Sequence, residues 1–244
     1  MVDRPTTVNR QPSTMKHIPP KELILRTLRE KSVLKQNVYK QTAFVFSQFK
    51  EVVRGIAEEY KEKMAKVDQR ITIKYKDKGE FEFELTFAGD LLIFHMHTNV
   101  FEFDKSHGIW KTSYVREDEM NSFCGVINVY NFLADSFKYK RVKDVGYLIE
   151  RIFINKELHY FVEGKRQLGF LYNDFVNSII DKQSITNIVE STILYCLNFD
   201  LFTPPFENVK EVSVEEIIEA SDGMQITTGK RLGFRFSSEV DNIE

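Results

Sequence analysis

The sequence predicts an α+β protein, in which a mainly antiparallel sheet packs with a long N-terminal helix and a C-terminal helical group. Three observations predict it. Apolar residues recur at three- and four-residue steps between 37 and 67, which is helical spacing, and the same spacing returns after Gly169. Between these regions, residues 70–163 form short runs in which apolar and polar side chains alternate. These runs predict about six to eight strands.

The first part of the chain predicts a tail and two helices. Residues 1–18 are mostly polar and contain two prolines, which is typical of a disordered tail. A short helix is expected over 21–30, with Leu25 and Leu28 on its apolar face. A second helix, the longest of the chain, is expected to begin at Asn37 because Asn is a favoured N-cap residue.

Period-two alternation predicts the strands. The first hairpin pairs 70–76 with 81–87 and has one apolar and one wet face. Two later strands, 148–154 and 158–162, are expected to pair with each other. The other predicted strands are 91–97, 100–104, 109–115 and 123–132.

Beyond residue 165 the sequence predicts helices and one last hairpin. Ser184 is expected to cap a helix that continues to Asn198. Residues 224–236 follow an Asp-Gly turn and have the alternation of a hairpin. We therefore expect a single α+β domain over 19–240, with residues 165–240 as a helical subdomain in the alternative arrangement.

The segment 91–104 predicts a hairpin with a two-residue turn at Thr98–Asn99. In this register His95 lies opposite Glu102, and His97 lies on the same face of the sheet. A shift by one residue would move every side chain to the other face, so the pattern itself supports the register. The opposite face of the hairpin would then be apolar and hold Phe94, Met96, Phe101 and Phe103.

His95, His97 and Glu102 are the candidate metal ligands of the chain. Two histidines two positions apart on a strand point the same way and lie about 6–7 Å apart, a spacing that suits one metal ion. Two histidines and one carboxylate are a known ligand set for iron and for catalytic zinc, and His107 could add a ligand. The alternative is an ordinary His–Glu pair on a wet sheet face, which is the commoner arrangement.

Charge is divided unevenly along the chain, although the formal net charge is only −2. Residues 1–78 hold 18 Lys and Arg against 9 Asp and Glu, a net of +9, and residues 79–244 hold 16 against 27, a net of −11. A basic first third could contact nucleic-acid phosphates. No nucleic-acid-binding motif accompanies it, and a simpler interpretation is that the basic helix covers the acidic sheet.

The sequence predicts neither export nor membrane insertion. The longest uncharged stretch, 120–134, is shorter than the roughly 20 apolar residues that cross a bilayer, and the first residues lack the apolar run of a signal peptide. The two cysteines, Cys124 and Cys196, have no metal-binding or redox motif around them, which favours a reducing compartment. We expect a cytoplasmic protein.

No sequence motif of a known catalytic mechanism is present, and three functional hypotheses stay open. The first is a non-catalytic binding or interaction domain, whose partner is another protein or a second copy. The second is a metal-dependent enzyme or metal-binding protein that holds a divalent ion through the His-x-His pair. The third is a nucleic-acid-associated protein. Whether the chain is an enzyme is left undecided.

Overall fold

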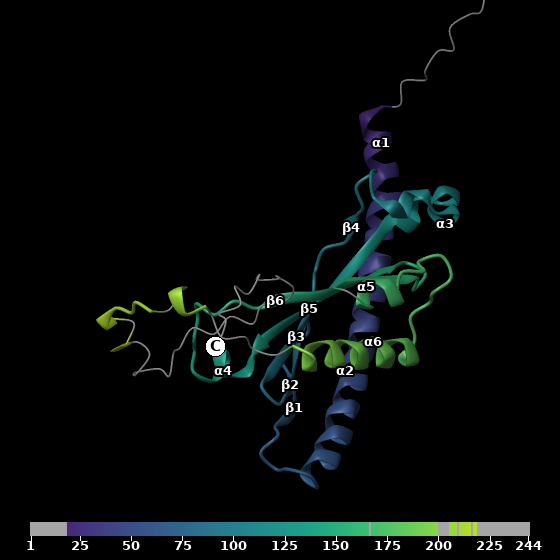
Figure 1. Ribbon diagram of the computed structural model, residues 1–244. Helices are drawn as coiled ribbons and strands as arrows, with labels where there is room; N and C mark the ends of the chain where they lie inside the picture. The colour runs from purple at the N-terminus through teal and green to yellow at the C-terminus, as the bar shows by residue number, and fades with distance from the viewer. Residues whose placement is uncertain (1–18, 166, 200–204, 209, 216, 219–244) are drawn as a thin grey trace, which may run out of the picture.

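The computed structural model describes residues 19–165, 167–199, 205–208, 210–215 and 217–218. Within these ranges, one antiparallel sheet has the strand order β1-β2-β3-β5-β6-β7, and β4 also pairs with β5. The α+β class and the mainly antiparallel sheet are thus confirmed (Figure 1). The strands are β1 Ile73–Asp77, β2 Glu82–Phe87, β3 Asp90–Met96, β4 Phe101–Glu102, β5 Phe123–Leu133, β6 Tyr147–Asn155 and β7 Tyr160–Gly164.

A single uninterrupted helical run opens the described chain. It consists of α1 (Pro20–Thr27), a π-helical stretch η1 (Leu28–Ser32) and α2 (Val33–Ala65). The predicted start of a separate helix at Asn37 is wrong, because Asn37 lies inside α2. No Gly or Pro interrupts the residues between the two predicted helices, so nothing in the backbone forces a break. No helix in the described ranges combines the length and apolarity that crossing a bilayer requires.

Helix α2 packs on one face of the sheet and supplies much of the core. Nine of its residues are buried, most of them at steps of three or four residues, as the sequence predicts. The Phe46 ring lies 5.2 Å from that of Phe83 on β2, and the Phe49 ring 6.2 Å from that of Phe94 on β3. Each of these buried rings contributes roughly 1.5–3 kcal/mol of hydrophobic stabilisation.

Helix α2 lies very close to the sheet at Gly125 on β5. A Cβ atom at Gly125 would lie 2.1 Å from Oγ1 of Thr42 on α2, which is far inside contact distance. Thr42 is itself buried, and its hydroxyl donates to the Val38 carbonyl at 2.8 Å. The absence of a side chain at Gly125 therefore sets how near α2 can come to the centre of the sheet.

The C-terminal helices complete the same face. They are α5 (Gln167–Leu171) and α6 (Lys182–Leu197), followed by a short 3-10 turn, η4 (Phe206–Asn208). The N-cap of α6 is Asp181, whose carboxylate accepts the backbone N–H of Ser184 at 2.7 Å, so the predicted cap at Ser184 is wrong by three residues.

Two of the predicted elements, the tail over 1–18 and the hairpin over 224–236, lie outside the described residues. The single domain over 19–240, and the subdomain over 165–240, stay predictions.

Small helices rather than a strand cover part of the opposite face. The predicted strand over 109–115 is wrong: the chain forms η2 (Gly108–Lys111) and α3 (Ser113–Glu117) there. The Thr112 side chain caps α3 by accepting the Val115 N–H. This local capping outweighs the alternation of Trp and Tyr, which suggested a strand. Another 3-10 turn, η3 (Glu119–Ser122), precedes β5, and α4 (Ala134–Lys138) follows it.

Candidate functional site

The predicted hairpin over 91–104 is not formed. Strands β3 and β4 both pair with the same edge of β5: Met96 lies opposite Ile127, and Phe101 opposite Cys124. Residues 97–100 therefore interrupt the pairing along one edge of β5. They are not a turn between two strands that pair with each other. Two physical reasons account for this. Thr-Asn lacks the glycine that favours a tight hairpin turn, and β5 offers eleven mostly buried residues for pairing.

This topology separates the predicted metal ligands. His95 is paired opposite Asn128 of β5, whereas Glu102 is paired opposite Phe123, five residues further along the same strand. Five residues of strand correspond to about 16 Å. Glu102 instead forms an ion pair with Lys31 of η1 at 3.4 Å. The structure does not bring Glu102 to His95.

The other histidines of this region have local contacts. The backbone N–H of His97 donates to the Val126 carbonyl at 2.9 Å, and its Nδ1 accepts the Asn99 N–H at 3.0 Å. Nδ1 of His107 accepts the Ile109 N–H at 3.3 Å. No group of three or more His, Cys, Asp or Glu side chains in the described ranges is placed to hold a metal ion. Metal binding by His95 and His97 stays a prediction, but the expected third ligand, Glu102, does not lie beside them.

The correct register reveals a polar row that sequence reasoning missed. Directly opposite positions on five adjacent strands hold Glu82, His95, Asn128, Arg151 and Glu163 in succession. The Nε of Arg151 donates to the Glu163 carboxylate at 2.6 Å. Glu82, rather than Glu102, is the acidic residue across from His95. Alternation predicts that Glu82 and His95 lie on the wet face of their strands, but only the pairing shows that the five positions align.

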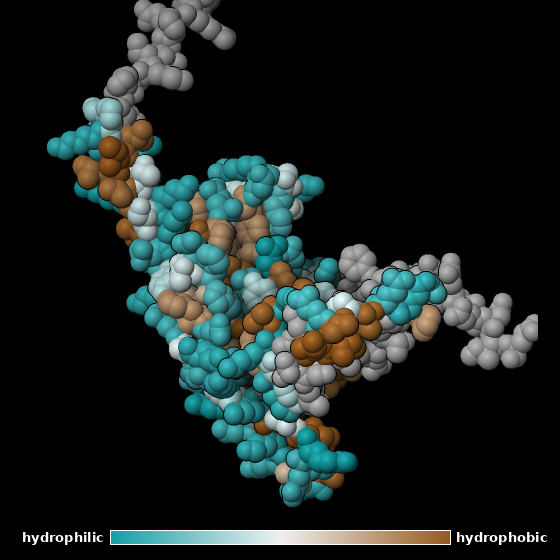
Figure 2. Space-filling view, turned by 90° about the vertical axis from the view of Figure 1, so that its left-hand side faces the viewer, coloured by the Kyte–Doolittle hydropathy of each residue, from teal (hydrophilic) through white to brown (hydrophobic). Residues whose placement is uncertain are grey.

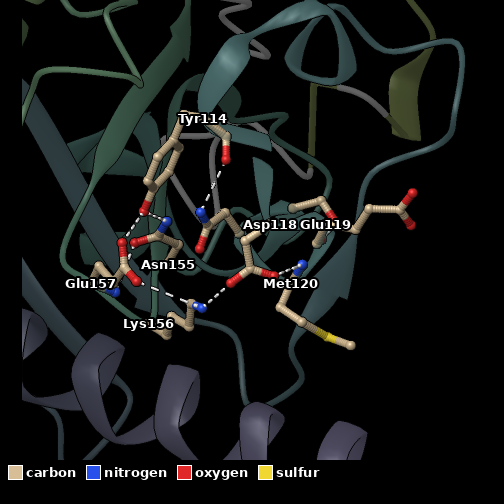
Figure 3. Close-up of polar contacts among 9 residues, drawn as sticks. Tyr114, Asp118, Glu119, Met120, Asn155, Lys156 and Glu157 are labelled. Carbon is tan, nitrogen blue, oxygen red and sulfur yellow. Dashed lines mark hydrogen bonds and ion pairs between the residues drawn. The ribbon is translucent and has the colours of Figure 1, made fainter. Parts of the chain in front are cut away.

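A second polar cluster joins residues 114–118, which precede β5, to residues 155–157 at the β6–β7 turn (Figure 3). The Tyr114 hydroxyl donates to the Glu157 carboxylate at 2.6 Å and accepts from Asn155 Nδ2 at 2.8 Å. Lys156 donates to Asp118 at 2.5 Å and lies 3.6 Å from Glu157. The partners in these three hydrogen bonds are 43, 41 and 38 residues apart in the sequence. The cluster therefore holds residues 114–118 against the β6–β7 turn.

The protonation states in this cluster suit a structural role. Burial, with the hydrogen bond to Glu157 second, raises the pKa of Tyr114 well above its usual range. The hydrogen bond from Lys156 lowers the pKa of Asp118. At neutral pH Tyr114 is thus neutral and can donate to Glu157, and Asp118 is charged and can accept from Lys156. Both groups are therefore in the protonation state that their hydrogen bonds require. His159 extends the cluster, since its ring stacks on Tyr114 with centroids 4.5 Å apart.

Glu150 is the most perturbed carboxyl group in the described chain. It lies on β6 beneath α6, 1% exposed, and its Oε1 accepts the Thr192 hydroxyl at 2.8 Å. Among the residues that the structure describes, its Oε2 has no hydrogen-bond partner. Burial raises the pKa of Glu150 to about 8, and the hydrogen bond from Thr192 opposes this only in part. On the sheet, Glu150 is paired opposite Val129, a residue of the main apolar core.

Both cysteines, Cys124 and Cys196, are buried. Burial raises the pKa of the Cys124 thiol well above its usual range, so the thiolate needed for nucleophilic chemistry is disfavoured there.

The first thirteen residues of the helical run are exposed, unlike the buried or paired side chains described above. We call residues 20–32, which comprise α1 and η1, the projecting helix, because they extend past the end of the sheet (Figure 1). None of its residues is buried. Figure 2 shows apolar side chains gathered on it. The large apolar ones and their exposed fractions are Leu23 46%, Ile24 58%, Leu25 46% and Leu28 53%.

No protein-family model, curated protein or solved structure matches the chain. The fold and the surfaces above therefore define it by class alone: an α+β protein with one antiparallel sheet, long helices on one face, small helices on part of the other, and a helix that continues past the sheet.

Proposed function

We propose that the protein is a non-catalytic interaction domain and that the projecting helix is its docking element. The observation that supports this most is the set of four large apolar side chains, each about half exposed, on a helix without a buried residue. A contiguous exposed apolar surface is unfavourable in water and commonly marks a protein-binding site. A helix that lays such a face into a groove or against another helix is a recurrent recognition mode.

The polar groups that could suggest chemistry have structural explanations instead. The Tyr114 hydroxyl is saturated by Glu157 and Asn155, and Glu150 is buried beneath α6. These arrangements fix loops and helices to the sheet. No specific observation favours the metal-binding or nucleic-acid hypotheses over this one, and the cytoplasmic location remains an expectation.

Site-specific photocrosslinking tests the proposal. A benzophenone amino acid would replace Leu28, and in a matched control it would replace Glu58, which is exposed on α2. After irradiation in the cells that naturally make the protein, we expect discrete adducts from position 28 and none from position 58. Adduct formation should fall strongly when Leu25→Ser is added. Equal adducts at both positions, or none at position 28, would contradict the proposal.

A further inference from the structure

We infer that the projecting helix binds the same helix of a second copy of this chain, in antiparallel orientation. The inference rests on the proposed function and identifies the partner. It is carried by the pattern of apolar and charged side chains on residues 20–32, all of which are exposed.

The apolar side chains form a stripe that suits helix pairing. Ile24, Leu25 and Leu28 lie within one turn of one another and share a side, since residues three and four apart are neighbours on a helix. Lys21 lies four residues before Leu25, and Ser32 lies four residues after Leu28, so both are on the same side of the helix. The apolar stripe is therefore short and has a polar residue at each end. A centre of this kind, with a polar rim, is typical of a protein interface.

The charges select the second copy and its orientation. Glu22 and Arg29 are seven residues apart, about two turns, and therefore lie on the same flank of the stripe. If Leu25 of one copy faces Leu28 of the other in antiparallel helices, Glu22 of each copy lies beside Arg29 of its partner. The two contacts are related by a two-fold axis, as an isologous dimer requires. In a parallel pair the same flank of the two copies lies on opposite sides of the seam, so Glu22 and Arg29 of different copies would not meet.

Both charges are available for this contact. Neither Glu22 nor Arg29 forms an ion pair within the part of the chain that the structure describes. Their neighbour Lys31 differs, because it pairs with Glu102 and lies 5.0 Å from the centre of the Phe123 ring. Lys31 thus holds the base of the projecting helix against the sheet and leaves the flank with Glu22 and Arg29 open.

The size of the helix sets the expected strength. Thirteen residues (8 in α1 and 5 in η1) span about 20 Å, so two such helices bury an area at the low end of specific interfaces. We therefore expect a reversible dimer that forms at high protein concentration and dissociates on dilution.

Sedimentation velocity with charge-exchange variants tests the dimer. The wild-type chain should shift from one toward two chains as its concentration rises from micromolar to near millimolar. Glu22→Lys or Arg29→Glu alone places like charges together and should weaken the dimer at least about tenfold. The double variant, and an equimolar mixture of the two single variants, should restore it. Lys61→Glu, at an exposed position on α2, is the control and should leave dimerisation unchanged.

Each outcome decides the inference. A wild-type chain that stays monomeric at the highest concentration, or a double variant that fails to recover the dimer, overturns it. If the chain stays monomeric while position 28 crosslinks to a different protein, the second copy is wrong but the docking role of the helix stands. If position 28 gives no adduct and the chain is monomeric, the proposed function fails as well.

Discussion

Two stretches of one helical run have opposite relations to the rest of the molecule. Residues 33–65 bury nine side chains against the sheet and α6, whereas residues 20–32 bury none. Both stretches carry apolar side chains at helical spacing. The difference teaches that amphipathic spacing predicts a helix and its apolar side, but whether that side faces its own sheet or a partner depends on where the sheet ends.

The largest effect is expected from Phe49→Ala in α2. Phe49 is 0% exposed and lies against Phe94, so its removal leaves a cavity in the main core. We expect the free energy of unfolding to fall by about 4 kcal/mol, measured by urea denaturation. A loss below about 1 kcal/mol would show that α2 is held far more loosely than its burial indicates.

A pH-dependent effect is expected from Glu150. Its pKa in the folded protein is about 8, against 4.5 as the ordinary value. Between these values the unfolded chain is ionised while the folded chain keeps the proton, so stability falls as pH rises. From pH 5 to pH 8 this contribution loses about 3 kcal/mol.

Glu150→Gln should remove most of that pH dependence and make the protein more stable at pH 8, measured by denaturation at both pH values. The control is Glu58→Gln on α2, which is exposed and should leave the pH profile unchanged. A profile that is the same for wild type and Glu150→Gln would contradict the raised pKa.

Gly125→Ala tests the close approach of α2 and the sheet. The new methyl group would meet Thr42 at 2.1 Å, so the helix must shift or the side chain must move. We expect a loss of about 2 kcal/mol in the free energy of unfolding. Adding Thr42→Gly should recover part of this loss. If the two changes are simply additive, the contact does not limit helix packing.

The smallest effect is expected from Leu25→Ser in the projecting helix. Since Leu25 is about half exposed and has no buried neighbour within that helix, the free energy of unfolding of the monomer should change by less than about 0.5 kcal/mol. The measurement is denaturation at low protein concentration. A loss comparable to that of Phe49→Ala would mean that residues 20–32 belong to the core, and the contrast between the two stretches would disappear.

Local patterns in the sequence predict much of the sheet. The pairing of β1 with β2 and of β6 with β7 follows from alternation across short turns and is confirmed. Strand β5 is also predicted within one residue at its C-terminal end, at Leu133. These elements are fixed by neighbours in sequence, so a local pattern contains the information.

The candidate metal site could not be predicted correctly for the same reason. The partner of His95 is decided by β5, more than 30 residues away, and not by the adjacent segment that contains Glu102. Alternation gives the face of a side chain but not its neighbour across the ladder. Likewise, Leu25 and Leu28 are correctly predicted as an apolar face, but their exposure follows from the length of the helix relative to the sheet.

The uninterrupted backbone between the two stretches has a consequence for amide hydrogen exchange. Amides of residues 20–32 can open by fraying from the helix end at little free-energy cost, whereas those beyond Leu34, the first buried residue of α2, can open only when core contacts break. A steep protection gradient should therefore cross the π-helical stretch. No loop separates the two sides, so a partner that orders the projecting helix would move this gradient toward the N-terminus. Binding of a partner to the helix could then be measured from the amide exchange of the protein itself.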